Sequence, residues 1–107
     1  MQMTLSIETA QRQPKSAPAT LQKNAIRVDG RLTMSREALD FKSFSSDCLY
    51  GPYHLPLNEI VKVETCWGKG AGILPITPDG IQVSLSNGER YQFIVADPED
   101  WVQRLSS

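Results

Sequence analysis

The sequence predicts a mainly β fold, an antiparallel barrel or sandwich of about seven short strands with one short C-terminal helix as a lid. From residue 19 onward, apolar residues recur at every second position, which is the period of a half-buried strand. Clusters of Gly, Pro, Ser and Asn interrupt this alternation at short intervals and mark turns. Near the C-terminus the period becomes helical, directly after an Asp-Pro pair.

The composition indicates one globular domain. The chain has 107 residues, of which 40% are hydrophobic and 21% charged, and this is enough for one modest core. No apolar run approaches the roughly 20 residues that cross a bilayer. The N-terminus also lacks the basic and apolar segments of a secretory signal. We therefore expect a cytoplasmic protein.

Residues 1–18 are predicted to form a flexible N-terminal tail, and residues 19–107 the folded domain. The segment at residues 9–18 contains two prolines and few apolar side chains, so it has little to bury. Within the tail, Leu5 and Ile7 alternate with polar neighbours, a weak pattern that is compatible with a short pairing strand.

Two alternating runs on either side of residues 35–38 predict the first clear hairpin. A loop at these residues places Met34 opposite Leu39 and Leu32 opposite Phe41. All four apolar side chains then lie on one face of the hairpin, as a half-buried pair of strands requires.

A serine-rich connection at residues 42–52 leads to a strand at residues 53–57. This strand contains Pro56, which has no N–H to donate to a neighbouring strand. We therefore expect the strand to lie at an edge of the sheet, where a partner strand can add only on the side that does not need this N–H.

The next strand is predicted at residues 60–67, with Val61, Val63 and Trp67 on one face. The glycine-rich residues 68–72 that follow are expected to form a mobile loop between strands. They lack the Gly-Lys-Ser/Thr ending of a phosphate-binding loop and do not open a helix, so the sequence does not predict a phosphate site there.

The last hairpin carries the most information. Its Asn-Gly pair suits a two-residue turn, but that register would split the apolar residues between the two faces. A three-residue loop ending at Gly88 instead places Val83 opposite Tyr91 and Ile81 opposite Phe93. It also puts Gly88 at the left-handed position that such loops favour.

The C-terminal helix is predicted to begin at Asp97, which suits the N-cap, and at Pro98, which suits the first helical position. Trp101 and Leu105 lie four residues apart and form one apolar stripe. A helix of about eight residues is not stable alone in water, so it must dock on the sheet. Trp101 is the expected anchor.

The chain shows no assembled catalytic or metal-binding set. Cys48 and Cys66 are too far apart for a Cys-x-x-Cys metal site and are expected to be reduced thiols. A nucleophilic pair of Cys48 with His54, the only histidine, lacks a convincing orienting group, since Asp47 is adjacent to the thiol. A Cys–His enzyme is therefore only a remote alternative, and we expect no cofactor and no metal.

The charge balance excludes global attraction to a polyanion. Eleven basic and twelve acidic residues give a net charge of −1, whereas nucleic-acid binders usually carry a clear basic excess. Most aromatic residues fall on the expected core positions. Only Phe44, Tyr50 and Tyr53, around the serine-rich connection, are predicted to be exposed, so we expect no nucleic-acid partner.

Several short motifs occur in an order that points to one family. Gly-Arg-Leu-Thr-Met at residues 30–34 precedes Leu-Asp-Phe-Lys-Ser at 39–43 and Leu-Pro-Leu-Asn-Glu-Ile at 55–60. Gly-Ile-Leu-Pro, Pro-Asp-Gly-Ile and Asn-Gly-Glu-Arg-Tyr-Gln-Phe follow, and Trp101 comes in the final helix. In this order the sequence resembles the GRAM family of pleckstrin-homology-like (PH-like) domains, in a bacterial single-domain type.

The resemblance implies a partly open, PH-like antiparallel barrel of about seven strands, capped at one end by the C-terminal helix. It also implies a module that binds phospholipid headgroups or protein segments without catalysis. Candidate binding residues are Lys23, Arg27 and Arg31, which are expected to share the first loop, with Trp67 and Lys69 further along the chain. Our leading hypothesis is a non-catalytic module that binds a protein partner or a second copy of itself. The alternative is weak attachment to anionic phospholipid.

Overall fold

The computed structural model describes residues 14–23, 26–70 and 74–106, with the backbone alone for residues 68–70 and 74–78. Seven strands and two helical segments account for most of this part of the chain. They are β1 (Lys15–Lys23), β2 (Ile26–Met34), β3 (Ala38–Ser43), β4 (Tyr53–Pro56), the 3-10 turn η1 (Leu57–Glu59), β5 (Ile60–Gly70), β6 (Leu74–Leu85), β7 (Arg90–Ile94) and α2 (Pro98–Leu105).

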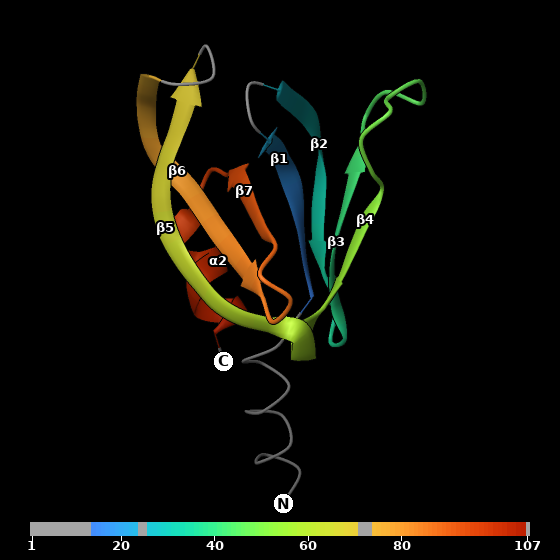
Figure 1. The fold of residues 1–107 in the computed structure, drawn as a ribbon, viewed down its shortest axis with the longest axis vertical. Helices are drawn as coiled ribbons and strands as arrows, with labels where there is room; N and C mark the ends of the chain where they lie inside the picture. The colour runs from blue at the N-terminus through green and yellow to red at the C-terminus, as the bar shows by residue number, and fades with distance from the viewer. Residues whose placement is uncertain (1–13, 24–25, 71–73, 107) are drawn as a thin grey trace, which may run out of the picture.

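The seven strands form one sheet in the order β4-β3-β2-β1-β7-β6-β5, and every pairing is antiparallel. The sheet curls on itself, and α2 packs beside β5 and β6 (Figure 1). The two end strands, β4 and β5, follow each other in the chain but are not paired in the sheet. The barrel is therefore open along one side, and the predicted seven-stranded fold with one C-terminal helix is confirmed.

The predicted register of the first hairpin is confirmed. Leu32 lies opposite Phe41, and Met34 lies opposite Leu39. All four side chains are at most 1% exposed. The apolar alternation was therefore sufficient to fix this pairing, because a shift of one residue would turn the apolar side chains of one strand toward solvent.

The predicted register of the last hairpin is confirmed as well. Val83 lies opposite Tyr91 and Ile81 opposite Phe93. The backbone N–H of Leu85 donates to the carbonyl of Glu89 at 2.8 Å, which leaves a three-residue loop between them. Gly88 has a φ of 93°, the left-handed conformation that the loop requires.

The core lies between the curled strands and α2. Trp101 is fully buried, so α2 docks through the residue predicted to anchor it. Phe41 and Phe93 are in contact in the centre of the barrel, with ring centroids 5.5 Å apart. The other fully buried large side chains come from β1, β2, β3 and β6 and are Leu21, Leu32, Met34, Leu39, Ile81 and Val83.

The folded domain begins earlier than predicted. β1 starts at Lys15, so residues 15–18 belong to the sheet and not to a tail that ends at residue 18. Pro18 is tolerated because it pairs with β2 on one side, while pairing with β7 on the other side begins only at Thr20. Residues 1–13, including the alternation at Leu5 and Ile7, lie outside the described residues.

Strand β5 differs from its prediction at both ends. Ile60 pairs with Leu85 and Lys62 with Ser84, so Val61 is an extra residue in a β-bulge. The bulge turns Val61 to solvent, and the prediction that it shares a face with Val63 is wrong. Residues 68–70 continue β5 and pair with β6, so the predicted loop does not begin at residue 68. Residues 71–73 lie outside the described part of the chain.

The start of α2 is where it was predicted, but Asp97 does not cap it through its side chain. Pro98 occupies the first turn, and the backbone N–H of Trp101 donates to the carbonyl of Asp97 at 3.2 Å. The carboxylate of Asp97 instead binds the ammonium group of Lys15. This side chain thus links the helix to β1.

We expect Gly30→Ala to destabilise the fold by about 2–3 kcal/mol, because the new methyl group would overlap backbone that cannot move independently. A Cβ at this position would lie against the carbonyl oxygen of Lys42 and 2.7 Å from the ring of Phe41. The matched control is Gly88→Ala, which meets nothing within 4 Å and strains only a positive φ, with an expected cost of about 1 kcal/mol. Urea unfolding measures both, and an equal or smaller loss for Gly30→Ala would contradict the prediction.

Candidate functional site: a groove beside strand β5

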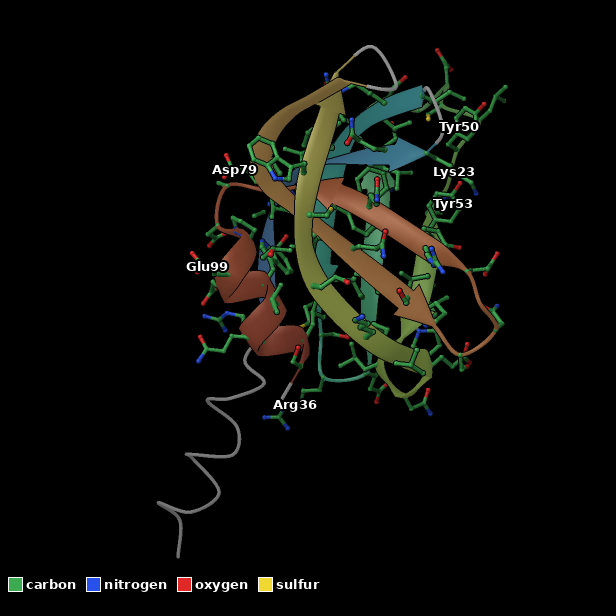
Figure 2. All side chains as sticks on the ribbon, turned by 60° about the vertical axis from the view of Figure 1, so that its left-hand side comes forward. Lys23, Arg36, Tyr50, Tyr53, Asp79 and Glu99 are labelled. Carbon is green, nitrogen blue, oxygen red and sulfur yellow. The ribbon has the colours of Figure 1, made fainter. Side chains whose placement is uncertain are left out.

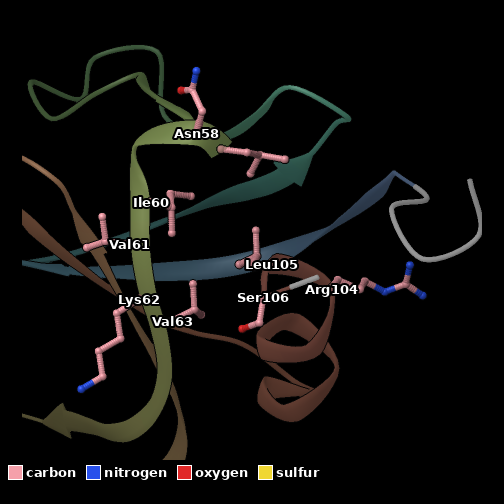
Figure 3. Close-up of a pocket in the computed structure, with 9 residues that line it drawn as sticks. Asn58, Ile60, Val61, Lys62, Val63, Arg104, Leu105 and Ser106 are labelled. Carbon is pink, nitrogen blue, oxygen red and sulfur yellow. The ribbon is translucent and has the colours of Figure 1, made fainter. Parts of the chain in front are cut away.

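A groove of about 330 Å³ runs between the first half of β5 and the C-terminal end of α2. Figure 3 shows β5 on one side and the helix on the other. The strand contributes Ile60, Val61, Lys62 and Val63, and the helix contributes Arg104 and Leu105. The two walls are brought together by the docking of α2 and not by any local pattern of the sequence.

The backbone of β5 is available along this groove. β5 is the last strand of the sheet, and within the described residues it pairs only with β6. In a strand, the amide groups of successive residues point alternately to the two sides. Every second residue of β5 therefore directs its N–H and C=O away from β6, as in any edge strand.

Apolar side chains contribute to the base of the groove, although most of its accessible surface is polar. Ile60, Val63 and Leu105 are partly buried and pack against the core, and Leu57 of η1 does the same. The bulge presents Val61 at the rim with 64% of its surface exposed. The groove thus offers apolar contact surface next to unpaired backbone groups.

The rim of the groove is charged. Lys62 forms an ion pair with Glu64 at 3.5 Å, and Arg104 Nε donates to the Asp100 carboxylate at 2.8 Å. The second pair joins positions i and i+4 of the helix. Both basic side chains are thus paired with carboxylates, and their ends point away from the groove in Figure 3.

A cluster around Lys15 holds the helical wall in place. The ammonium group of Lys15 contacts the carboxylates of Asp97 and Asp100 and lies 4.9 Å from the centroid of the Trp101 ring. Burial acts to lower the pKa of Lys15, but the hydrogen bonds to Asp100 and Asp97 outweigh it, so the pKa is raised. Hydrogen bonds from Lys15 and Arg104 lower the pKa of Asp100. The cluster is therefore charged at neutral pH.

The three basic residues predicted to share the first loop lie in β1 and β2 and do not converge. Lys23 ends β1 on the same side of the strand as buried Leu21, whereas Arg27 and Arg31 are exposed on the other face of β2. Asp29 lies between the two arginines on that face. The structure thus divides these candidates between two surfaces, because side chains on a strand alternate between its faces.

Lys23 instead lies at the end of β1, with its ammonium group over the rings of two tyrosines. Its ammonium group is 5.4 Å from the ring centroid of Tyr53 and 5.8 Å from that of Tyr91, which are themselves 5.3 Å apart. Burial, with the nearby charge of Glu89, raises the pKa of Tyr91. Lys23, Tyr50 and Tyr53 lie together, away from Glu99 on α2 (Figure 2). Tyr50 and Tyr53 are partly buried against the core, so of the aromatic residues predicted to be exposed only Phe44 is clearly so.

The two remaining candidates belong to β5. Trp67 is 56% exposed and lies further along the strand that forms the groove. The side chain of Lys69 is outside the described residues. Pro56 correctly indicated an edge strand, since β4 ends the sheet, but the groove lies beside β5 at the other end.

Cys48 and His54 bind different partners. The thiol of Cys48 donates to the carbonyl of Tyr50 at 3.5 Å and accepts from its N–H at 3.4 Å. Nδ1 of His54 is hydrogen bonded to the carboxylate of Asp40 on the neighbouring strand.

Within the part of the chain that the structure describes, no three His, Cys, Asp or Glu side chains are grouped to hold a metal ion. The same residues include no helix with the length and apolar character needed to cross a membrane.

Comparison with solved structures gives the fold. The solution structure of the N-terminal PH domain of human ARAP2 matches with a TM-score of 0.65 and 15% identity, over 89% of this chain and 77% of that one. The crystal structure of the C-terminal domain of an unknown protein from Leishmania infantum matches with a TM-score of 0.64 and 11% identity, over 87% and 83%. No protein-family model matches the sequence, and no curated protein is significantly similar to it.

The chain therefore has a PH-like fold, with a seven-stranded antiparallel sheet and one short C-terminal helix. At this identity the likeness concerns the fold alone, so a function has to be argued from the groove and the surfaces of this chain.

We expect Lys15→Met to destabilise the protein by about 1 kcal/mol at pH 7, a value reduced for the partial exposure of both carboxylates. The loss should shrink as the pH falls below about 4, because the lowered pKa of Asp100 means that its contribution is fully present above the unfolded-state pKa and is lost as the carboxylate is protonated in the folded protein. The raised pKa of Lys15 keeps its own contribution until the pH exceeds 10.5. Urea unfolding at several pH values measures the effect.

The matched control is Lys42→Met. Lys42 is exposed and forms no ion pair with the described residues. We expect the free energy of unfolding of this variant to stay close to that of the unchanged chain at every pH. A pH-independent loss in Lys15→Met would show that the ion pairs do not hold α2 on the sheet.

Proposed function

We propose that this chain is a non-catalytic binding module that takes an extended segment of a partner protein as an added strand along β5. The observation that supports this proposal is the groove, in which the unpaired edge of β5 lies beside α2 and polar surface is combined with the partly buried side chains of Ile60, Val63 and Leu105. Backbone hydrogen bonds to β5 would supply affinity in such a complex, and alternate side chains of the segment would fill the groove.

The exposed apolar residues support the same surface. Four large hydrophobic side chains are exposed within the described residues, and two of them, Val61 and Trp67, belong to β5. A segment that pairs with β5 from residue 61 to residue 67 would cover both. Exposed apolar surface next to a free strand edge is a feature of interaction sites in soluble proteins.

A partner segment fits this edge better than the β5 strand of a second copy. The register shifts at Ile60/Lys62 and at Cys66/Gly68 bend the strand, and Lys62 places a charge on it. Bulges and lysines of this kind discourage two long edges from pairing directly. A single short segment needs only the stretch beside α2.

The motif order at residues 30–34, 39–43 and 55–60 supports placing this module in the GRAM branch of PH-like domains, in its bacterial single-domain type. A module of this kind would act in the cytoplasm. The binding surface argued above does not depend on that assignment.

Selection of random peptides of about ten residues on the whole chain should yield binders that shift the amide resonances of residues 60–66 in an NMR titration. Val61→Asp should lower the affinity for these peptides about tenfold, because it replaces an apolar side chain at the rim of the groove by a charged one. The matched control is Leu49→Asp, at a residue that is 92% exposed and does not line the groove. We expect Leu49→Asp to bind as the unchanged chain does.

Three results would contradict the proposal. Binders that shift resonances only outside residues 60–66 would place the site elsewhere. Equal peptide affinities of Val61→Asp and Leu49→Asp would show that Val61 is not part of the binding site. Formation of dimers by the unchanged chain that Val61→Asp abolishes would assign the β5 edge to self-association instead.

A second candidate function is weak attachment to anionic phospholipid. Arg31 lies directly opposite Lys42 on the outer face of β2 and β3, and neither forms an ion pair with the described residues. Opposed like charges are unfavourable without a counter-charge, which an anionic surface would supply. Arg27 would add to this attraction, and each basic residue contributes about 1 kcal/mol.

For this candidate, the chain should sediment weakly with phosphatidylserine vesicles at low salt and be released as the salt concentration rises. Arg31→Glu should abolish sedimentation, because it replaces a favourable charge by an unfavourable one. The matched control, Arg36→Glu in the loop between β2 and β3, should sediment as the unchanged chain does. Sedimentation that is absent or insensitive to salt removes this function.

A further inference from the structure

We propose that the outer face of β1, β2 and β3 binds the same face of a second copy of this chain and forms a two-fold symmetric dimer. This surface shares no residue with the groove beside β5, so the inference does not depend on the proposed function. It rests on the order of charged and apolar side chains across the three strands.

The register of the strands arranges this outer face in two parallel rows. Asp29 of β2 lies opposite Thr20 of β1, and the backbone N–H of Phe44 donates to the carbonyl of Asp29 at 3.0 Å. Arg31 lies two residues further along β2, on the same face, and also has a neighbour on each side. The Asp29 row comprises Thr20, Asp29 and Phe44, and the Arg31 row comprises Pro18, Arg31 and Lys42.

The charges of the two rows have no ionic partner within the described residues. Asp29 accepts a hydrogen bond from the hydroxyl of Thr20 at 2.7 Å, and Arg31 donates to the hydroxyl of Ser16 at 3.2 Å. Neither side chain, nor that of Lys42, forms an ion pair in this part of the chain. All three are exposed, so a partner that brings a cation to Asp29 and a carboxylate to Arg31 would find both charges accessible.

Apolar surface accompanies these charges. The ring of Phe44 is 60% exposed and lies where two hollows of about 300 Å³ and 420 Å³ meet. Both hollows are lined mostly by apolar surface; Arg31 and Lys42 line the first, and Pro18 and Ile94 line the second. An exposed aromatic ring between apolar hollows, with charges around it, is typical of a protein interface.

The two rows are complementary to each other, and this selects a second copy as the occupant. A two-fold axis that runs between the facing sheets and crosses β2 over Gly30 places the Asp29 row of each copy against the Arg31 row of the other. Asp29 then meets Arg31, and the ring of Phe44 meets the ammonium group of Lys42. Each contact occurs twice, as in any isologous interface. Gly30 is buried, so no side chain projects at the axis.

The dimensions of packed sheets suit this arrangement. Neighbouring side chains on one face of a strand lie about 7 Å apart, and packed sheets lie about 10 Å apart. A guanidinium group on one sheet can therefore reach a carboxylate one row away on the other. The axis crosses the strands, so the strands of the two copies run nearly antiparallel, within the angle of about 30° that aligned sheets adopt.

The test measures the dissociation constant of the dimer by sedimentation equilibrium of the whole chain in the absence of lipid. Arg31→Glu should raise this constant at least about tenfold, because the new carboxylate faces Asp29 of the second copy. Asp29→Lys should raise it similarly, because the new ammonium group faces Arg31. An equimolar mixture of the two variants should dimerise as the unchanged chain does, since both contacts in the mixed pair join opposite charges.

The matched control for charge is Arg36→Glu, which makes the same change in the loop between β2 and β3, outside both rows, and should leave the dimer unchanged. A second variant without a charge change is Phe44→Ser, which should also raise the dissociation constant about tenfold. Its control is Leu49→Ser, at a residue that is 92% exposed and lines neither hollow. Because Phe44 is exposed, this pair decides the question even when Asp29→Lys does not fold.

Four results would overturn the inference. The first is a chain that stays monomeric over the whole concentration range. The second is a mixture of Arg31→Glu and Asp29→Lys that dimerises no better than either folded variant alone. The third is an equal dissociation constant for Phe44→Ser and Leu49→Ser. The fourth is a dimer that Val61→Asp abolishes and Arg31→Glu leaves intact, because it would form through the edge of β5.

Vesicle sedimentation separates this inference from attachment to anionic phospholipid, which would use Arg31 and Lys42 as well. Asp29→Lys weakens the dimer but adds a positive charge, so it should strengthen binding to phosphatidylserine vesicles. A monomeric chain whose vesicle binding is lost in Arg31→Glu would retain the lipid function and exclude the dimer.

Discussion

The docking of α2 through Trp101 is the interaction on which the rest of the structure depends. A helix of eight residues is not stable alone in water. Helix α2 therefore forms because the indole of Trp101 is fully buried against the sheet. Nε1 of Trp101 has no hydrogen-bond partner among the described residues, which costs about 1–3 kcal/mol. Burial of a tryptophan is worth about 3–5 kcal/mol and outweighs that cost. Lys15 adds a second attachment, from β1, beside the same ring.

The sequence was informative where one face of a strand is buried. In the last hairpin a shift of one residue would have exposed the apolar side chains of one strand, so the pairing of Val83 with Tyr91 followed from alternation. The sequence did not predict strand pairing that depends on backbone hydrogen bonds rather than on buried side chains. Residues 15–18 include no large apolar side chain, yet they extend β1, because hydrogen bonds between strands do not depend on such side chains. The bulge at Val61 likewise has no sequence signal.

The groove was not predictable for a related reason. Its walls come from residues 60–63 and from Arg104 and Leu105, which are far apart in the sequence and meet only when α2 docks. The sequence instead predicted a binding surface that includes Lys23, Arg27 and Arg31. The alternation of side chains on a strand then placed Lys23 on one face and Arg27 on the other. Trp67 and Lys69 were the two candidates on the strand that forms the groove.

The two ends of the sheet differ in a way that bears on function. β4 has only four residues and contains Pro56, so it offers few unpaired backbone groups to another chain. β5 has eleven residues, and α2 lies beside its first half with the groove between them. Its bulges and Lys62 discourage a long flat contact with another sheet, but they leave the stretch beside α2 open. An open-sided barrel must leave two edges, and in this chain one edge is short while the other is long, bulged and bordered by the groove beside α2.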